Sequence, residues 1–243
     1  IGSNATPRSL LQAVADGKVV QYRFTILEGT RFRDLRVALA SVPELESTLT
    51  GLPDNDVLTR IGATEAHPEG LFLPDTYFFP RGFSDLDLLK RAYWEQKELL
   101  ERLWQKRQEN LPLSDPYEAL ILASVIEKET GKAAERPLIA GVFVNRLRQG
   151  WRLQTDPTVI YGLGDAFDGN LKRVHLETDT PYNTYTRFGL PPTPIALPSP
   201  AAIEAALQPQ ATEAMYFVAK GDGSHQFSRT LEEHNRAVRE YQL

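Results

Sequence analysis

The chain has 243 residues, a formal net charge of −5, and 42% hydrophobic and 24% charged residues, values typical of an ordinary globular protein. The acidic balance, without a basic stripe interleaved with aromatic residues, argues against a nucleic-acid partner. The absence of cysteine excludes disulfides, thiolate metal ligands and cysteine nucleophiles, and the four scattered histidines predict no metal site.

The N-terminal half is predicted to hold two extended segments and two helices. A β-branched, partly alternating segment at 19–27 predicts a strand. The aromatic segment at 70–80 is extended, and its prolines exclude a central position in a sheet along its whole length. Amphipathic helices are predicted at 31–40 and from 84 or 85 to about 109, with a connector of short helices at 41–68.

Residues 115–129 predict a helix that is apolar for almost three turns and then presents a carboxylate. Asp115 is suited to the N-cap, Glu118 to the acidic position of a capping box, and Gly131 to the C-terminal stop. This helix carries the first candidate for chemistry.

Glu127 shares a helix face with the small residues Ala123 and Ser124. Partial desolvation there would raise the pKa of Glu127 and favour a protonated general acid near neutral pH. The alternative is that an acid at a helix end simply reaches solvent. Glu129, two residues on, points to nearly the opposite side and is expected to be solvated.

The C-terminal half is predicted to contain a helix at 137–149, a short helix at 200–207, a hairpin from strands at 215–220 and 226–228, and a closing helix at 231–241. Residues 151–200 between them are predicted to be irregular, because proline, glycine, threonine, tyrosine and asparagine crowd this stretch. Such a long irregular stretch inside a compact domain is uncommon unless it builds a functional surface.

The amides, hydroxyls and tyrosine rings of this stretch suit a carbohydrate. Amides and carboxylates pair with sugar hydroxyls and acetamido groups, while aromatic faces stack on the C–H surface of a pyranose. The alternative is a loop that these groups hold together by their own hydrogen bonds.

The presence or absence of a second carboxylate distinguishes a hydrolytic glycosidase from an enzyme whose substrate supplies the nucleophile. Hydrolytic glycosidases generally use two carboxyl groups. Asp156 is the other acid within a polar loop motif, but an Asp-Pro pair more often makes a turn. The sequence thus indicates one clear acid, which favours a reaction in which the substrate supplies its own nucleophile.

Several motifs in one order resemble the YceG-like family of bacterial, MltG-type endolytic murein transglycosylases, and the resemblance runs from about Val19 to the C-terminus. The motifs are Glu28-Gly29, EGLFLPDTY at 69–77, ASVIEKET at 123–130, VNRL at 144–147, LQTDPTVIYG at 153–162, YNTY at 182–185, GLPP at 189–192 and Pro194-Ile195.

The resemblance implies an α+β protein with a lytic-transglycosylase-like catalytic domain at 67–243, preceded at 1–66 by a small α/β subdomain that keeps the later part of a LysM-like region. It also implies a membrane anchor, absent from this chain, that places the full-length protein on the periplasmic face of the bacterial inner membrane. The expected partners are peptidoglycan glycan strands and peptidoglycan synthases. No cofactor is expected: the label aminodeoxychorismate lyase, which many members carry, would require a pyridoxal-phosphate lysine and phosphate cup that are not recognisable here.

The expected reaction is cleavage of the β-1,4 bond between N-acetylmuramic acid and N-acetylglucosamine inside glycan strands. The resemblance implies that Glu127, the first glutamate of Glu-Lys-Glu-Thr, is catalytic and leaves a 1,6-anhydro end. The alternative is a non-catalytic peptidoglycan-binding module of the division machinery. The predicted substrate-binding residues are Ser124, Gln154, Thr155, Asp156, Tyr161, Asn183 and Tyr185.

Overall fold

A two-stranded antiparallel sheet underlies the N-terminal part of the chain. The computed structural model describes residues 6, 8 and 19–242; the start of the subdomain predicted at 1–66 lies outside them. Strand β1 (Gln21–Thr25) pairs with β3 (Thr76–Pro80), so that Tyr22 lies opposite Phe79. Tyr77 and Phe79 are buried whereas Phe78 between them is exposed, as the period of a strand requires. The extended segments predicted at 19–27 and 70–80 are confirmed as strands over 21–25 and 76–80.

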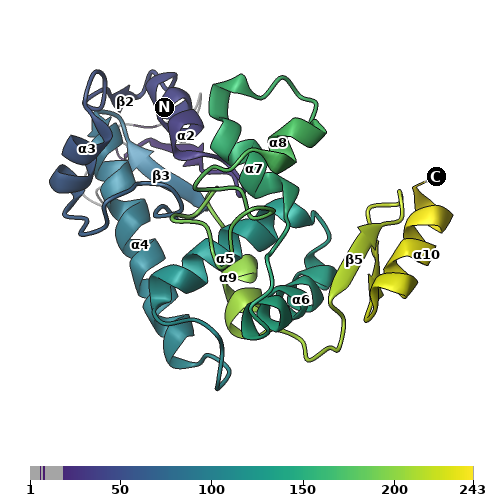
Figure 1. The fold of residues 1–243 in the computed structure, drawn as a ribbon. Helices are drawn as coiled ribbons and strands as arrows, with labels where there is room; N and C mark the ends of the chain where they lie inside the picture. The colour runs from purple at the N-terminus through teal and green to yellow at the C-terminus, as the bar shows by residue number, and fades with distance from the viewer. Residues whose placement is uncertain (1–5, 7, 9–18, 243) are drawn as a thin grey trace.

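Helices cover this sheet and lead into the body of the molecule (Figure 1). Helix α2 (Phe32–Ala40) buries Phe32, Leu35 and Leu39, and α3 (Asp54–Ile61) lies in the predicted connector. The short strands β2 (Leu45–Glu46) and β4 (Phe83–Ser84) pair in parallel just before the long helix α4 (Asp85–Gln105). The helices predicted in this half are therefore present.

Helix α5 (Pro116–Glu129) is the centre of the body. Asp115 accepts a hydrogen bond from the amide of Glu118, as predicted, and every residue from 119 to 126 is buried. A helix that is apolar all round is buried on all sides, and here α4, α6 (Arg136–Arg148) and α9 (Pro200–Leu207) pack around it. The 3₁₀ turn η1 (Ala133–Glu135) joins α5 to α6.

The stretch predicted to be irregular contains helices, so that prediction was wrong in part. Asp156 and Pro157 do not make a turn; they begin helix α7 (Asp156–Leu163). Proline suits the first turn of a helix because its fixed φ is already helical and no intrahelical bond is lost. The 3₁₀ turn η2 (Gly164–Ala166) and the short helix α8 (Arg173–Glu177) follow.

The C-terminal residues form a hairpin with a helix packed on it, as predicted, which we call the C-terminal unit (216–242). Strands β5 (Tyr216–Ala219) and β6 (His225–Ser228) are antiparallel, and α10 (Leu231–Tyr241) packs against both. The unit stands to one side of the helical body in Figure 1. No helix within the described part of the chain is both long and apolar enough to cross a membrane.

Candidate active site

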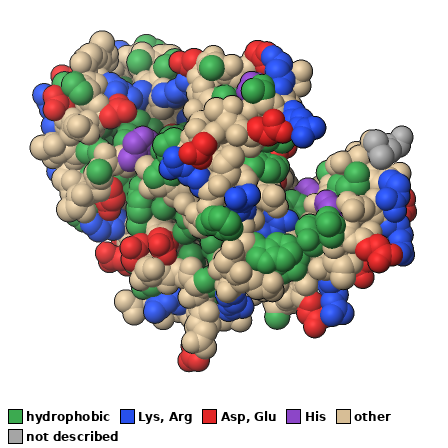
Figure 2. Space-filling model, viewed as in Figure 1, with side chains coloured by type: hydrophobic (Ala, Val, Ile, Leu, Met, Phe, Trp, Pro, Cys, Tyr) green, Lys and Arg blue, Asp and Glu red, His purple; other side chains and the backbone are tan. Residues whose placement is uncertain are grey.

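A cavity of about 520 Å³ lies between the helical body and the C-terminal unit. Figure 2 shows the surface hollowed at this place, with histidine side chains inside the hollow. Segments far apart in the sequence meet in it: the end of α5, one residue of α6, the start of α7, and β5, β6 and α10. The lining residues used below are Glu129, Arg146, Gln154, Asp156, Tyr185, Tyr216, His225 and His234.

Glu129 is the acid that α5 contributes to this cavity, so the prediction that it is solvated was wrong. The segment that begins α7 covers this face of α5, and the hydroxyl of Thr155 donates to Oε1 of Glu129. Burial raises the pKa of Glu129 to about 7; the Thr155 hydrogen bond opposes the rise and the charge of Asp156 adds to it. A carboxyl group with this pKa can give up and take back a proton near neutral pH.

Glu127 lies on the other side of α5 and is held by protein groups. Arg136 Nη2 lies 2.9 Å from Oε1, and Oε2 accepts hydrogen bonds from the amide (2.9 Å) and the hydroxyl of Ser199. Its side chain is only 4% exposed. Residues two apart on a helix are separated by about 200° around its axis. Glu127 therefore ties α5 to α6 and α9, and the structure does not bring it together with the cavity residues.

The segments 154–156 and 183–185 are joined by hydrogen bonds and carry polar side chains of the cavity wall. The amide of Gln154 donates to the carbonyl of Thr184 at 3.1 Å, and the amide of Thr155 donates to the hydroxyl of Thr184 at 3.1 Å. Gln154 has φ of 50°, a left-handed conformation that costs free energy in a residue with a Cβ and that often marks a functional segment. This pairing places the predicted residues Gln154 and Asp156 beside Tyr185.

Asp156 adds a second carboxyl group to this cavity. The hydroxyl of Tyr185 donates to Oδ1 of Asp156 at 2.6 Å. The pKa of Tyr185 is raised, first by burial and then by its contact with Asp156. The phenol thus stays protonated and holds the Asp156 carboxylate at the start of α7.

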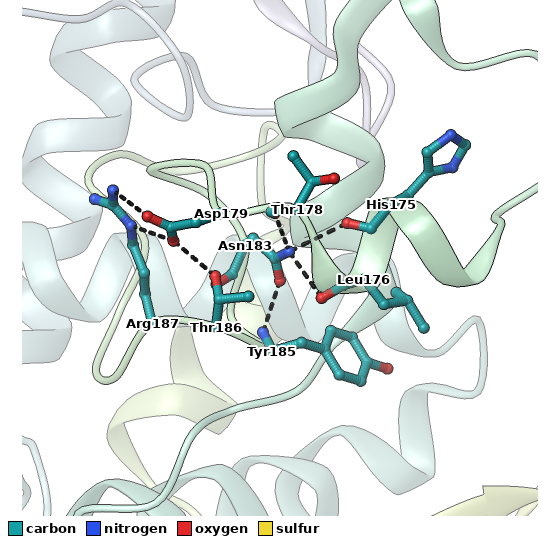
Figure 3. Close-up of polar contacts among 8 residues, drawn as sticks. All are labelled: His175, Leu176, Thr178, Asp179, Asn183, Tyr185, Thr186 and Arg187. Atoms are coloured by element: carbon teal, nitrogen blue, oxygen red, sulfur yellow. Dashed lines mark hydrogen bonds and ion pairs between the residues drawn. The ribbon is translucent and has the colours of Figure 1, made fainter.

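Asn183 belongs to the scaffold behind the cavity (Figure 3). Its amide nitrogen lies 3.1, 3.0 and 2.7 Å from the carbonyls of His175, Leu176 and Thr178, and its oxygen accepts from the amide of Tyr185 at 2.8 Å. With 0% of its surface exposed, its hydrogen-bonding groups face the backbone of its own loop. Of the two predicted roles, the structure favours loop support over sugar contact.

Ser124 is also scaffold. It is fully buried; its hydroxyl donates to the carbonyl of Ile121 at 2.7 Å and accepts from the amide of Ile195 at 2.9 Å. It therefore fixes the proline-rich segment against α5 and does not reach the cavity.

Tyr161 lies in a different cavity of about 310 Å³, which it lines together with Arg31, Glu69 and Tyr182. Its hydroxyl donates to Oε2 of Glu69 at 3.2 Å, and the Arg31 guanidinium lies 5.1 Å from the centre of its ring. Burial raises the pKa of Glu69 to about 7. The same carboxyl accepts from the amide of Phe32 at 2.9 Å, so it caps α2 and links it to α7.

The sequence reasoning missed Arg146, Glu135 and the residues of the C-terminal unit. The buried Arg146 donates to the carbonyls of Met215 (2.8 Å) and Leu153, which joins α6 to both walls of the cavity. His225 of β6 contacts Glu135 at 2.7 Å. Arg146 belongs to the VNRL motif at 144–147 and follows the apolar run of α6, which is a local signal for a buried charge. His225 and Glu135 are 90 positions apart in the sequence, so no local sequence pattern could predict their contact.

Among the residues that the structure describes, no three His, Cys, Asp or Glu side chains come together to hold a metal ion. The polar groups in the cavity are instead amides, carboxyl groups, hydroxyls, ring nitrogens and a guanidinium spread over its walls. They suit a polar organic ligand.

Comparisons with known proteins agree on one family. The model of the YceG-like family matches residues 1–240. A relative from Bacillus subtilis, named endolytic murein transglycosylase, is 32% identical over 96% of this chain and 69% of its own length. A Streptococcus pneumoniae protein of the same name is 31% identical over 84% of this chain, but over 36% of its own length. A crystal structure of a yceG-like protein from Listeria monocytogenes, 30% identical, superposes with a TM-score of 0.68 over 94% of this chain and 80% of that one. With its fold of mixed helices and strands, the chain belongs to the YceG-like family.

Proposed function

We propose that this protein is an endolytic lytic transglycosylase of peptidoglycan and that Glu129 is its general acid. The observation that carries the proposal is the position of Glu129: a partly buried carboxyl group, with its pKa raised to about 7, in a cavity that Gln154, Asp156 and Tyr185 also line. Raised pKa values at a polar cavity are typical of catalytic acids. The relatives named endolytic murein transglycosylases support the substrate class.

The proposed bond is the β-1,4 linkage between N-acetylmuramic acid and N-acetylglucosamine. Glu129 donates its proton to the bridging oxygen as the bond to C1 of the muramic residue breaks. The Glu129 carboxylate then takes the proton of the C6 hydroxyl while that oxygen bonds to C1. The products are a free 4-hydroxyl on one strand and a 1,6-anhydro end on the other, and Glu129 is protonated again. One group can do both steps because its pKa lies near the working pH.

Asp156 has a second role in this proposal. Cleavage develops positive charge at C1 and the ring oxygen, and a fixed carboxylate in a cavity stabilises such charge. The hydrogen bond from Tyr185 holds Asp156 in place, while the hydroxyl of Thr155 orients Glu129. Gln154, Asp156 and Tyr185 therefore remain proposed sugar contacts, whereas Ser124 and Asn183 act through the scaffold. Tyr161 belongs to the other cavity.

The wider context comes from the family resemblance. In this proposal the residues up to 66 are the later part of a LysM-like region and residues 67–243 are the catalytic domain. The full-length protein is anchored in the bacterial inner membrane with this domain on the periplasmic face, where it meets glycan strands and peptidoglycan synthases.

The chemistry of the new strand ends tests the reaction class. Purified glycan strands incubated with the protein should acquire 1,6-anhydro-muramic ends in step with the number of breaks. Reducing ends in their place would mean that water attacks, with Asp156 as the second carboxyl of a hydrolase. Strands that bind without any new end would favour the non-catalytic module.

A further inference from the structure

Two exposed aromatic rings flank the segments that line the Glu129 cavity. Trp151 is 38% exposed and Phe188 is 65% exposed. Trp151 precedes Gln154 and Asp156 by three and five residues, and Phe188 follows Tyr185 by three. The two segments are joined through Gln154 and Thr184, so each ring lies a few residues along the chain from a side chain that lines the cavity.

Contacts with neighbouring side chains connect these rings to the site. The Trp151 ring lies edge-on to Tyr216, which lines the cavity, with centroids 5.9 Å apart and planes at 68°. The Arg152 guanidinium lies 4.7 Å from the centre of the Phe188 ring, which brings hydrogen-bond donors next to it. An aromatic ring offers a large apolar face, and polar groups beside such a face suit the C–H surface and the hydroxyls of a sugar ring.

The volume of the cavity limits how much of a glycan strand it can hold. Its volume of about 520 Å³ lies within the ~300–1,000 Å³ typical of pockets for ligands of drug size. A polymer cleaved within its length must therefore leave the cavity and continue over the surface. The segments 151–156 and 183–188 lead along the chain from cavity-lining residues to Trp151 and Phe188.

We propose that Trp151 and Phe188 form an outer subsite on which sugar rings of a β-1,4-linked amino-sugar strand stack beyond the cavity. This inference rests on the proposed function and adds to it the expectation that long strands bind more tightly than short ones. Stacking on these two rings strengthens the binding of strands that are long enough to reach them. Short fragments that fill only the cavity do not gain this affinity.

Kinetics on strands of graded length test the subsite with a matched control. Trp151→Ala and Phe188→Ala should each raise KM on long strands about tenfold more than on the shortest fragment cleaved, and Trp151→Tyr should restore most of the loss. The control is Trp94→Ala. Trp94 is 47% exposed but lies on α4, against Tyr93 and Lys97. Equal effects of Trp151→Ala and Trp94→Ala, or equal losses at all lengths, would overturn the proposal.

A binding experiment separates this inference from the proposed chemistry. In the Glu129→Gln background, long strands should change the tryptophan fluorescence; Trp94→Phe should keep this change and Trp151→Phe should abolish it. This result would hold even if the protein cleaved nothing, so the subsite and the proposed reaction can fail independently. A fluorescence change that survives Trp151→Phe, whether it comes from Trp94 or from Trp104, would contradict the subsite.

Discussion

At the scale of single residues, the groups around Glu129 determine when it carries a proton. Burial is the largest influence on its pKa, and the neighbouring groups act in opposite directions: the hydroxyl of Thr155 stabilises the carboxylate and the charge of Asp156 destabilises it. Because the folded-state pKa lies above the ordinary value of 4.5, the folded state binds the proton more tightly than the unfolded state does. The stability associated with this proton is present at low pH and is lost as pH rises toward about 7.

Two substitutions should move the pH dependence of cleavage in opposite directions. The rate should fall as pH rises through about 7, where Glu129 loses its proton. Thr155→Val removes a donor to the carboxylate and should shift this limb upward, whereas Asp156→Asn removes a nearby negative charge and should shift it downward. Rates of strand cleavage from pH 5 to 9, normalised to each maximum, measure both shifts. Two shifts of the same sign, or a flat profile in a folded protein, would refute the assignment of the limb to Glu129.

At the scale of elements, local patterns predicted most helices and strands, while the coverage of each face depended on distant segments. Helix α5 was predicted from its cap and its apolar run. The face of α5 that lines the cavity was not predicted, because residues 119–126 are apolar on every side of the helix and do not indicate which neighbour covers which face. Ser199 covers the side of Glu127 and Thr155 the side of Glu129, and neither neighbour can be inferred from α5 itself. Helix α7 was missed because an Asp-Pro pair suits a helix start as well as a turn.

Substitution of Asn183 should lower mainly the stability of the protein, whereas substitution of Tyr185 should lower mainly its activity. Asn183→Ala leaves the carbonyls of His175, Leu176 and Thr178 without their donor and should lower the free energy of unfolding by about 2–3 kcal/mol. Tyr185→Phe keeps the ring and loses the hydrogen bond to Asp156, so it should slow cleavage about tenfold or more at a nearly unchanged Tm. Urea unfolding and initial rates on both variants supply the comparison. A stable Asn183→Ala protein with weakened glycan binding would return Asn183 to the list of sugar contacts.

At the scale of the whole molecule, the Glu129 cavity exists because the C-terminal unit lies against the body. Contacts from α6 and η1 hold it there: Asn145 donates to the carbonyls of Thr212 and Ala214 just before the unit, Phe143 packs edge-on against Phe217, and Glu135 contacts His225. None of these contacts could be predicted from sequence patterns, because they join residues about 67 to 90 positions apart. The hairpin and the closing helix were predicted; their position over Glu129 was not.

Loosening the C-terminal unit should weaken catalysis without unfolding the body. Glu135→Ala removes the acceptor of both the amide and the ring of His225. We expect faster hydrogen exchange in β5 and β6, unchanged exchange in α5, and a higher KM for strands. Lys90→Ala, on the exposed side of α4 away from the C-terminal unit, serves as the control. Unchanged exchange in the hairpin of Glu135→Ala would mean that this contact does not hold the unit.

The rate of strand cleavage by Glu129→Gln compared with Glu127→Gln tests the central claim most directly. Glu129→Gln keeps the shape and loses the transferable proton, so turnover should fall by ~10²- to 10⁴-fold in a protein that is at least as stable as the parent at pH 8. Glu127→Gln weakens a buried ion pair with Arg136 and should lower Tm, yet it should retain substantial turnover at a temperature where it is folded. The reverse pattern, an active Glu129→Gln and a folded but inactive Glu127→Gln, would contradict the account.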